Sequence, residues 1–265
     1  MKVYISADIE GVAGITHWDE ARKNHSDHSV YCQQMTREVV AACEGAVRAG
    51  AIEITVKDAH GSGRNLIANE LPDCVKLVRG WSGHPLCMVQ ELDASYDAVM
   101  MVGYHAKAGD EGNPLAHSLA LRVDTLEING VPASEFTVHY YAALMLGVPT
   151  VMLSGDSTIC RDVTQFNSHI QTVSVSEGVG ASTISISPSL ACKQIESAAT
   201  HALQGDLAVC KVAMPEHFEV RICYNEPVSA YRAAFYPGVS HIADRTVAFA
   251  SRDYFEVLRL LAFVT

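Results

Sequence analysis

The sequence predicts an α/β fold: a largely parallel sheet with helices on both faces, plus a smaller C-terminal α+β lobe. Two observations predict it. Short β-branched runs alternate with helical patterns through the first part of the chain, and this βαβ rhythm is typical of a parallel sheet covered by helices. After about Ser168 the alternation is looser. We therefore expect an α/β domain over residues 1–167 and a smaller lobe over residues 168–265, with one compact unit as the alternative.

The elements of the first half follow from apolar spacing. A β-branched run predicts a strand at 2–7, and apolar residues at a spacing of three to four predict a helix over 29–49. Gly50 ends that helix, as glycine commonly does at a helix C-terminus. The same patterns predict further strands and one short helix, at 53–57, 75–78, 86–92 (the helix) and 97–103.

A hairpin interrupts the alternation. Asn129-Gly130 is a strong two-residue turn signal, and it joins the predicted strands Leu119–Ile128 and Val131–Ser134. The alternation then resumes with a helix over 136–146 and a strand over 150–153. The C-terminal third offers a strand rich in Ser, Val and Ile, a helix over 189–203, strands at 219–223 and 246–250, and a closing helix over 254–263.

Composition excludes several classes of protein. The 265 residues carry 19 Lys+Arg against 30 Asp+Glu, a net charge of −11, which argues against nucleic-acid partners because these are held by basic side chains. The N-terminus lacks the apolar core of a signal peptide, and Gly147 and Pro149 break the longest uncharged stretch. No membrane segment is expected. Eight scattered cysteines without a CxxC pair indicate buried thiols in the cytoplasm.

Metal-ligand residue types follow three predicted strands. Asp8 and Glu10 come after the first strand, Asp58 and His60 after the second, and His105 after the strand at 97–103. Ligands of open parallel sheets bind outside the carboxyl ends of the strands. An acid there is often only a helix cap, and a lone histidine is often structural. Their coincidence at one edge nevertheless predicts a metal site, with Zn, Mn, Co or Fe as fitting ions.

The number of ions follows from charge. Several carboxylates crowded together repel one another unless cations neutralise them, which favours two ions over one. Zinc is the default metal for a hydrolase with imidazole and carboxylate ligands.

Five spaced motifs, continued by two more, then resemble one family over essentially the whole chain. That family is the zinc-dependent D-aminopeptidases associated with dipeptide-permease operons. The motifs that carry the resemblance are SADIEG (6–11), KDAHG (57–61), GYHA (103–106), AHS (116–118), INGVPASE (128–135), SGD (154–156) and YPGVSHIADRTVAF (236–249).

The resemblance assigns roles to single residues. It implies that Asp8 bridges two Zn²⁺ ions per subunit, that Glu10, His60, His105 and Glu135 are the remaining ligands, and that His117 is the catalytic residue. Glu135 is promoted by the resemblance alone, because an acid at the start of a helix is ordinarily a capping residue.

The resemblance also implies an activity and an assembly. It implies a metallo-aminopeptidase that hydrolyses short peptides with a free N-terminus, with D-residues such as D-Ala favoured, in a ring-shaped homo-oligomer, a decamer of stacked pentamers. We expect a metal-bridging hydroxide to attack the peptide carbon, with His117 transferring a proton or stabilising the oxyanion. A nucleophilic His117 is the alternative.

The chain departs from the family pattern at four positions. Ser176 and Ala181 stand where family members tend to have cationic side chains. Their absence could remove the group that binds the carboxylate of a peptide substrate. Glu91 stands where glycine is usual, and His139, one turn after Glu135, is either a packed histidine or a neighbour of the metals.

Some roles remain open between function and structure. Asp58 either orients an imidazole or holds a turn, and Ser118 and Arg122 either border the pocket or are structural. Two other functions remain possible. A dinuclear phosphoesterase would use GSGRN (61–65) as its anion cradle, and a non-enzymatic peptide-binding accessory of dipeptide uptake would not need His117.

Overall fold

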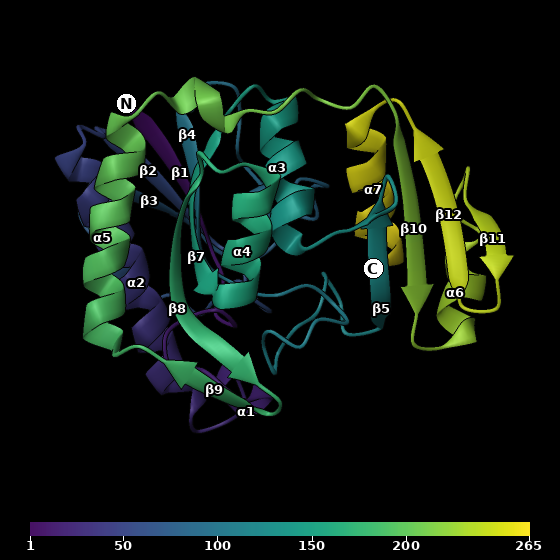
Figure 1. The fold of residues 1–265 in the computed structure, drawn as a ribbon, viewed down its shortest axis with the longest axis horizontal. Helices are drawn as coiled ribbons and strands as arrows, with labels where there is room; N and C mark the ends of the chain where they lie inside the picture. The colour runs from purple at the N-terminus through teal and green to yellow at the C-terminus, as the bar shows by residue number, and fades with distance from the viewer.

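Two sheets organise the chain, which a computed structural model describes over all residues 1–265. The larger sheet has seven strands in the order β3-β2-β1-β4-β7-β8-β9 (Figure 1). Every pair in it is parallel except the edge pair β8–β9. Its strands are β1 (Lys2–Ala7), β2 (Glu53–Asp58), β3 (Val75–Val78), β4 (Ala98–Tyr104), β7 (Thr150–Asp156), β8 (Gln171–Val179) and β9 (Ser182–Ser185).

Helices cover both faces of this sheet. On one face α2 (His28–Arg48) and α5 (Pro188–Gln204) pack against each other, and on the other face lie α3 (Glu135–Met145) and α4 (Ser157–Phe166) (Figure 1). The short α1 (Trp18–Ala21) contacts α2. Strands β1, β4 and β7 are buried along nearly their whole length, as expected for parallel strands covered on both faces. The predicted fold class is confirmed.

The second sheet is antiparallel and forms the smaller lobe at the right of Figure 1. Its strand order is β11-β12-β10-β5-β6. Its elements are β5 (Val123–Ile128), β6 (Val131–Pro132), β10 (Phe218–Tyr224), α6 (Pro227–Ala233), β11 (Ser240–Ala243), β12 (Thr246–Ser251) and α7 (Tyr254–Val264).

The two sheets interleave along the chain. Strands β5 and β6 come before residue 168 but belong to the smaller lobe, whereas β8, β9 and α5 come after it and pack on the larger sheet. The chain thus enters the smaller lobe twice, through the hairpin at Asn129-Gly130 and through residues 218–264. The division into domains 1–167 and 168–265 stays a prediction about which segments fold as units.

Some elements differ from the patterns in the sequence. The helix expected over 86–92 is only a 3₁₀ turn over Cys87–Val89, because Cys87 and Glu91 adopt φ values of 48° and 68°. A positive φ interrupts helical geometry and is a conformation that glycine adopts more readily than other residues. The patterns missed α4, whose N-cap Asp156 accepts hydrogen bonds from the backbone N–H groups of Thr158 and Ile159.

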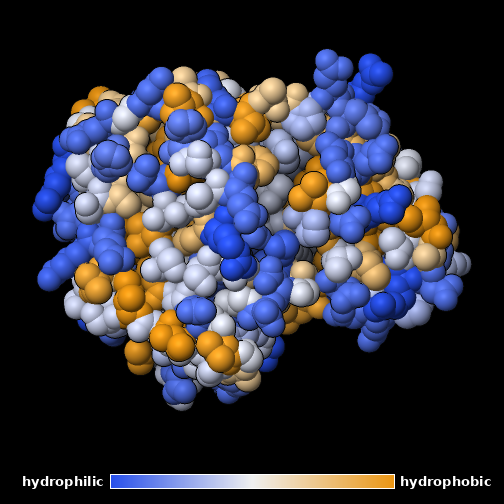
Figure 2. Space-filling view, in the orientation of Figure 1, coloured by the Kyte–Doolittle hydropathy of each residue, from blue (hydrophilic) through white to orange (hydrophobic).

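One continuous apolar core runs through both lobes. No helix combines the length and the apolar character that crossing a bilayer requires. On the visible face of both lobes, apolar residues are scattered among hydrophilic ones (Figure 2).

A buried acid on α2 makes stability depend on pH. Glu38 is fully buried, and its Oε1 accepts hydrogen bonds from the Ala13 backbone N–H and the Gln34 side chain. Its Oε2 has no partner. Burial raises the pKa of Glu38 to about 7. The ionised form therefore destabilises the fold, so stability falls as pH rises from about 4.3 to about 7.

Glu38→Gln should remove this pH dependence. Near pH 4 the variant and the parent should be equally stable, and at pH 8 the variant should be more stable by roughly 3 kcal/mol. Urea unfolding at both pH values measures the difference. Glu44→Gln, on the exposed face of the same helix, is the matched control and should follow the parent. Equal pH dependence in Glu38→Gln and the parent would disprove this assignment.

Candidate metal centre

The predicted ligands meet at one edge of the larger sheet. Strand β1 lies between β2 and β4, so their carboxyl ends are neighbours. Asp8 and Glu10 follow β1, and His105 follows β4. His60 lies two residues beyond the end of β2. The sheet order therefore brings these four side chains together, as the sequence predicted.

Two glycines let the loops after β1 and β4 touch. A Cβ at Gly11 would lie 1.8 Å from the carbonyl oxygen of Tyr104, and a Cβ at Gly103 would lie 2.3 Å from that of Asp8. Gly103 also has a φ of 73°. The loops are joined by a hydrogen bond of 2.9 Å from Gly11 N–H to the Gly103 carbonyl. Only glycine permits this approach, which places Asp8 and Glu10 against His105.

Three donor atoms converge on the β1–β2 side. His60 Nδ1 lies 3.0 Å from Glu10 Oε2 and 3.3 Å from Asp8 Oδ1. Both carboxylates are buried, with Asp8 only 2 % and Glu10 only 1 % exposed. The other oxygen of Asp8, Oδ2, faces His105 Nε2 at 3.6 Å. Asp8 thus presents one oxygen to each histidine.

A second group of donor atoms lies on the β4–α3 side. His105 Nε2 is 3.4 Å from Glu135 Oε2, and His117 Nε2 is 3.5 Å from Glu135 Oε1. The imidazoles of His105 and His117 stack, with ring centroids 4.4 Å apart and planes at 8°. The ring of Trp18 meets His117 edge-on at 5.3 Å. These contacts fix the orientation of both imidazoles.

Backbone carbonyls fix which nitrogen of each ring faces the centre. His60 Nε2–H donates to the Ala21 carbonyl, His105 Nδ1–H to its neighbour Ala106, and His117 Nδ1–H to Leu115. A carbonyl only accepts, so each of these nitrogens carries a proton. In the neutral ring the opposite nitrogen, which faces the carboxylates, then has a free lone pair. This is the arrangement of a metal-ligating histidine.

The inward atoms fit a metal and lack other partners. Glu10 Oε2 and His105 Nε2 are buried without a hydrogen bond, which is costly unless another group satisfies them. Two sets of side chains, Asp8–Glu10–His105 and His105–His117–Glu135, each offer ligand atoms within 4.8 Å of one another. The donors are carboxylates and imidazoles without a thiolate, a set that suits zinc.

Without metal, the charges of the centre perturb one another. Burial and the Glu10 carboxylate raise the pKa of Asp8 well above its usual range. Burial opposes ionisation of Glu10 as well, but the neighbouring His60 outweighs it and lowers the pKa of Glu10. In the same way Glu135 outweighs burial and raises the pKa of His105 to about 10. In the metal-free protein, protons on His60 and His105 balance the negative charge of the carboxylates. Metal cations would take over this role when they bind.

Glu135 is the candidate ligand that the local pattern did not reveal. It is the first residue of α3, after the N-cap Ser134, and it is 4 % exposed. Its Oε1 accepts a hydrogen bond of 2.8 Å from the backbone N–H of Leu119. Leu119 has a φ of 64°, a strained conformation that aims this N–H at the carboxylate. Because the partners come from distant segments, spacing alone carries no signal for Glu135.

Asp58 holds a turn. Its carboxylate accepts hydrogen bonds from the backbone N–H groups of Asn65 and Leu66 and from the Asn65 side chain, which also bonds to the His60 carbonyl. It makes no hydrogen bond to the His60 ring. Of the two readings left open for Asp58, the geometry supports the turn.

His139 is a packed helix histidine. Its Nδ1–H donates to the Glu135 carbonyl at 2.7 Å, and its Nε2 accepts from the Met88 N–H at 3.3 Å. Burial lowers its pKa to about 4. Both ring nitrogens are therefore used, and His139 stays neutral as it ties α3 to the segment around Met88.

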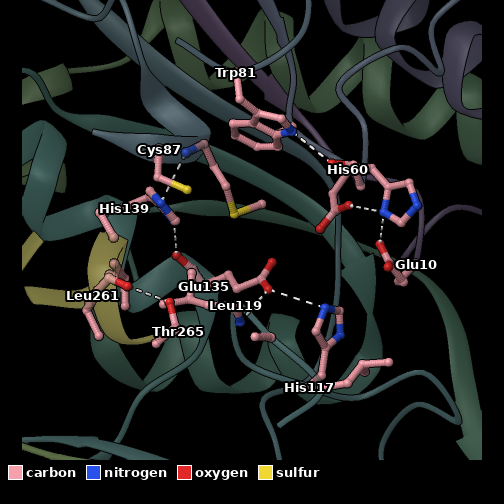
Figure 3. A pocket seen from close by; sticks show the side chains of 18 of the residues that line it. Glu10, His60, Trp81, Cys87, His117, Leu119, Glu135, His139, Leu261 and Thr265 are labelled. Carbon is pink, nitrogen blue, oxygen red and sulfur yellow. Dashed lines mark hydrogen bonds and ion pairs between the residues drawn. The ribbon is translucent and has the colours of Figure 1, made fainter. Parts of the chain in front are cut away.

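A cavity of about 450 Å³ opens from the centre. Asp8, Glu10, His60, His117 and Glu135 line it at one end (Figure 3). Ser118, Arg122, Ser176 and Ala181 are not among its lining residues, so within one subunit the departures at positions 176 and 181 leave the cavity wall unchanged. Ser118 is used structurally, since its hydroxyl donates to the Ala133 carbonyl and accepts from the Ala108 N–H.

Comparisons with known proteins agree with the geometry. The profile of the D-aminopeptidase family matches residues 1–263. A D-aminopeptidase of Bacillus subtilis (strain 168) is 27% identical over 270 residues, covering 100% of this chain and 97% of that protein. A solved structure, the "Zn-dependent D-aminopeptidase DppA from Bacillus subtilis, a self-compartmentalizing protease", superposes with a TM-score of 0.91 at 25% identity, covering 100% of this chain and 99% of the other. The chain belongs to the D-aminopeptidase family of peptide-bond hydrolases.

Proposed function

We propose that this chain is a dinuclear zinc aminopeptidase that removes an N-terminal D-amino acid, such as D-Ala, from short peptides. The observation that carries the proposal is the convergence of Asp8, Glu10, His60, His105 and Glu135 from four separate segments, with Glu10 Oε2 and His105 Nε2 buried without a hydrogen bond. The zinc dependence of the solved relative supports the choice of metal.

Two ions fit the centre better than one. Candidate ligands lie on two sides of the centre, Glu10 with His60 on one side and Glu135 with His105 on the other, and Asp8 presents one oxygen toward His60 and the other toward His105. A carboxylate with oxygens facing two sides suits a bridging role. The three carboxylates Asp8, Glu10 and Glu135 bring three negative charges, which two Zn²⁺ ions and one hydroxide would balance.

His117 is placed to move a proton. When bound, zinc would polarise the scissile carbonyl and lower the pKa of a bound water toward ~7. Because the Nδ1–H of His117 is used by the Leu115 carbonyl, its neutral ring presents Nε2 as an acceptor. We propose that Nε2 takes the proton of the attacking water and passes it to the leaving amine. Trp18 and His105 hold the ring in place for this transfer.

The lining of the cavity favours peptides over phosphate esters. None of its 21 lining residues is Lys or Arg, whereas phosphate recognition ordinarily uses such cations or a glycine-rich cradle. Of GSGRN, only Gly61 lines the cavity. The non-enzymatic alternative gives no reason for the ring of His117 to be held against His105.

We further propose a ring-shaped homo-oligomer, a decamer, in the cytoplasm. The relative is described as self-compartmentalizing, and this chain exposes large apolar side chains on the smaller lobe that a second copy would cover: Val228, Tyr231, Phe235 and Phe263. All eight cysteines are free, as a reducing compartment would keep them.

Chelation tests the proposed activity. Release of D-Ala from D-alanyl peptides should fall at least about 100-fold in excess chelator, because the metal supplies several kcal/mol of transition-state stabilisation. Added Zn²⁺ should restore the rate with two ions per chain. The same preparation should leave p-nitrophenyl phosphate intact. Phosphate ester cleavage without peptide cleavage would replace the proposal by the phosphoesterase.

A further inference from the structure

The cavity has a second end, which the proposed chemistry does not use. Opposite the metal-ligand side chains, its wall is apolar, and α7 of the smaller lobe supplies part of that wall (Figure 3). We call this the apolar end and define it by Met88, Val138, Leu258, Leu261 and Ala262.

The apolar end offers few hydrogen-bonding partners to a polar group of a substrate. Both ring nitrogens of His139 are bonded to backbone groups, and the hydroxyl of Thr265 donates to the Leu261 carbonyl. Burial raises the pKa of the Cys87 thiol to about 11, so this thiol stays neutral. A peptide amide or carboxylate moved to this end would lose its hydrogen bonds with water and gain few in return. An apolar side chain loses none.

The geometry also indicates which residue of a peptide enters. Core side chains form the floor of the apolar end, since Val138 and Leu258 are each 1% exposed, and Ala262 lies at its exposed rim. An aminopeptidase cleaves after the first residue, so only this residue has no chain continuing beyond it. The remainder of the peptide has to leave toward solvent. An apolar end with a buried floor, in the same cavity as the metal-ligand side chains, therefore fits the side chain of the first residue.

We propose that the apolar end is the specificity site for a bulky apolar N-terminal side chain, such as that of leucine or phenylalanine, in preference to alanine. This inference rests on the proposed aminopeptidase function. The methyl group of alanine would leave the apolar end unfilled, whereas each additional buried methylene adds binding free energy that discriminates between substrates.

A substrate pair tests the inference on the zinc-loaded full-length protein. We expect kcat/KM for D-leucylglycylglycine to exceed that for D-alanylglycylglycine by at least about tenfold. Equal rates, or a faster alanyl peptide, would overturn the inference and leave the aminopeptidase function intact.

Filling the apolar end should abolish this preference. Ala262 lines the cavity but is exposed, so Ala262→Trp adds volume there without disturbing the core. The leucyl-to-alanyl ratio of kcat/KM should fall at least about tenfold. Arg259→Ala is the matched control, because Arg259 lies on the same helix α7, is exposed and does not line this cavity. An unchanged ratio in Ala262→Trp would contradict the proposal.

A binding measurement separates the inference from the activity. 3-Methylbutylamine and ethylamine carry the amine and the side chains of leucine and alanine but have no bond to cleave. Calorimetry should show 3-methylbutylamine binding at least about tenfold more tightly, and Ala262→Trp should remove the difference. If neither peptide is cleaved but this difference is present, the proposed function fails and the apolar site stands. If the two amines bind equally, the apolar site fails.

Discussion

Asp8→Asn should lose both zinc ions and nearly all activity. Asp8 is the only carboxylate with oxygens facing both His60 and His105, so the substitution removes a ligand from both sides of the centre. We expect fewer than about 0.2 zinc ions per chain and a fall in kcat/KM on the order of 10⁴-fold, because several kcal/mol of transition-state stabilisation depend on the metal. Zinc analysis of the dialysed variant beside a peptide-hydrolysis assay measures both.

The metal-free stability of Asp8→Asn separates this loss from misfolding. Burial and Glu10 raise the pKa of Asp8, so its ionised form destabilises the metal-free fold above the unfolded pKa of about 3.9. At pH 7 the metal-free variant should therefore melt no lower than the metal-free parent. Asp73→Ala, at an exposed acid outside the centre, is the control and should keep both ions. Full zinc content in Asp8→Asn would refute the bridging role.

His117→Ala should retain both zinc ions but lose most turnover. The Nε2 of His117 approaches Glu135 Oε1. The contacts among the five proposed metal ligands do not involve His117. Loss of a positioned proton-transfer group commonly lowers kcat by about 10²- to 10⁴-fold. Zinc analysis and kcat measured on the same sample distinguish a lost catalyst from a lost ligand.

His117→Gln sharpens the assignment. Glutamine can donate a hydrogen bond but cannot shuttle a proton at neutral pH. If proton transfer is the role, Gln and Ala should be equally inactive and one limb of the pH–rate profile should vanish. Partial activity in Gln alone would favour oxyanion stabilisation. Loss of one zinc ion in either variant would make His117 a ligand, and full activity in His117→Ala would remove it from the mechanism.

The parallel sheet and four of the five proposed ligands followed from the sequence because their signals are local. Buried β-branched strands are visible as apolar runs, and a parallel sheet places the residues after its strands at one edge. Asp8, Glu10, His60 and His105 could therefore be assigned to one site from the sequence. The two lobes could not be divided in this way, because β5 pairs with β10, which comes about 100 residues later, and local patterns do not show such pairing.

The rest of the site depends on contacts between distant segments. Glu135 looks like an ordinary first residue of a helix, and only the fold brings it to His105. The positive φ values of Cys87 and Leu119 also have no local signal, since neither residue type favours that conformation. Family resemblance supplied Glu135 and His117, while the apolar end appeared only when α7 was seen to close the cavity.

The position of the metal ions tests the central claim most directly. Anomalous diffraction at the zinc edge, from crystals of the zinc-loaded protein, should show two peaks among Asp8, Glu10, His60, His105 and Glu135, and neither peak in Asp8→Asn. A single peak in the parent would contradict the dinuclear centre. No peak at this sheet edge, in protein that hydrolyses peptides, would contradict the account as a whole.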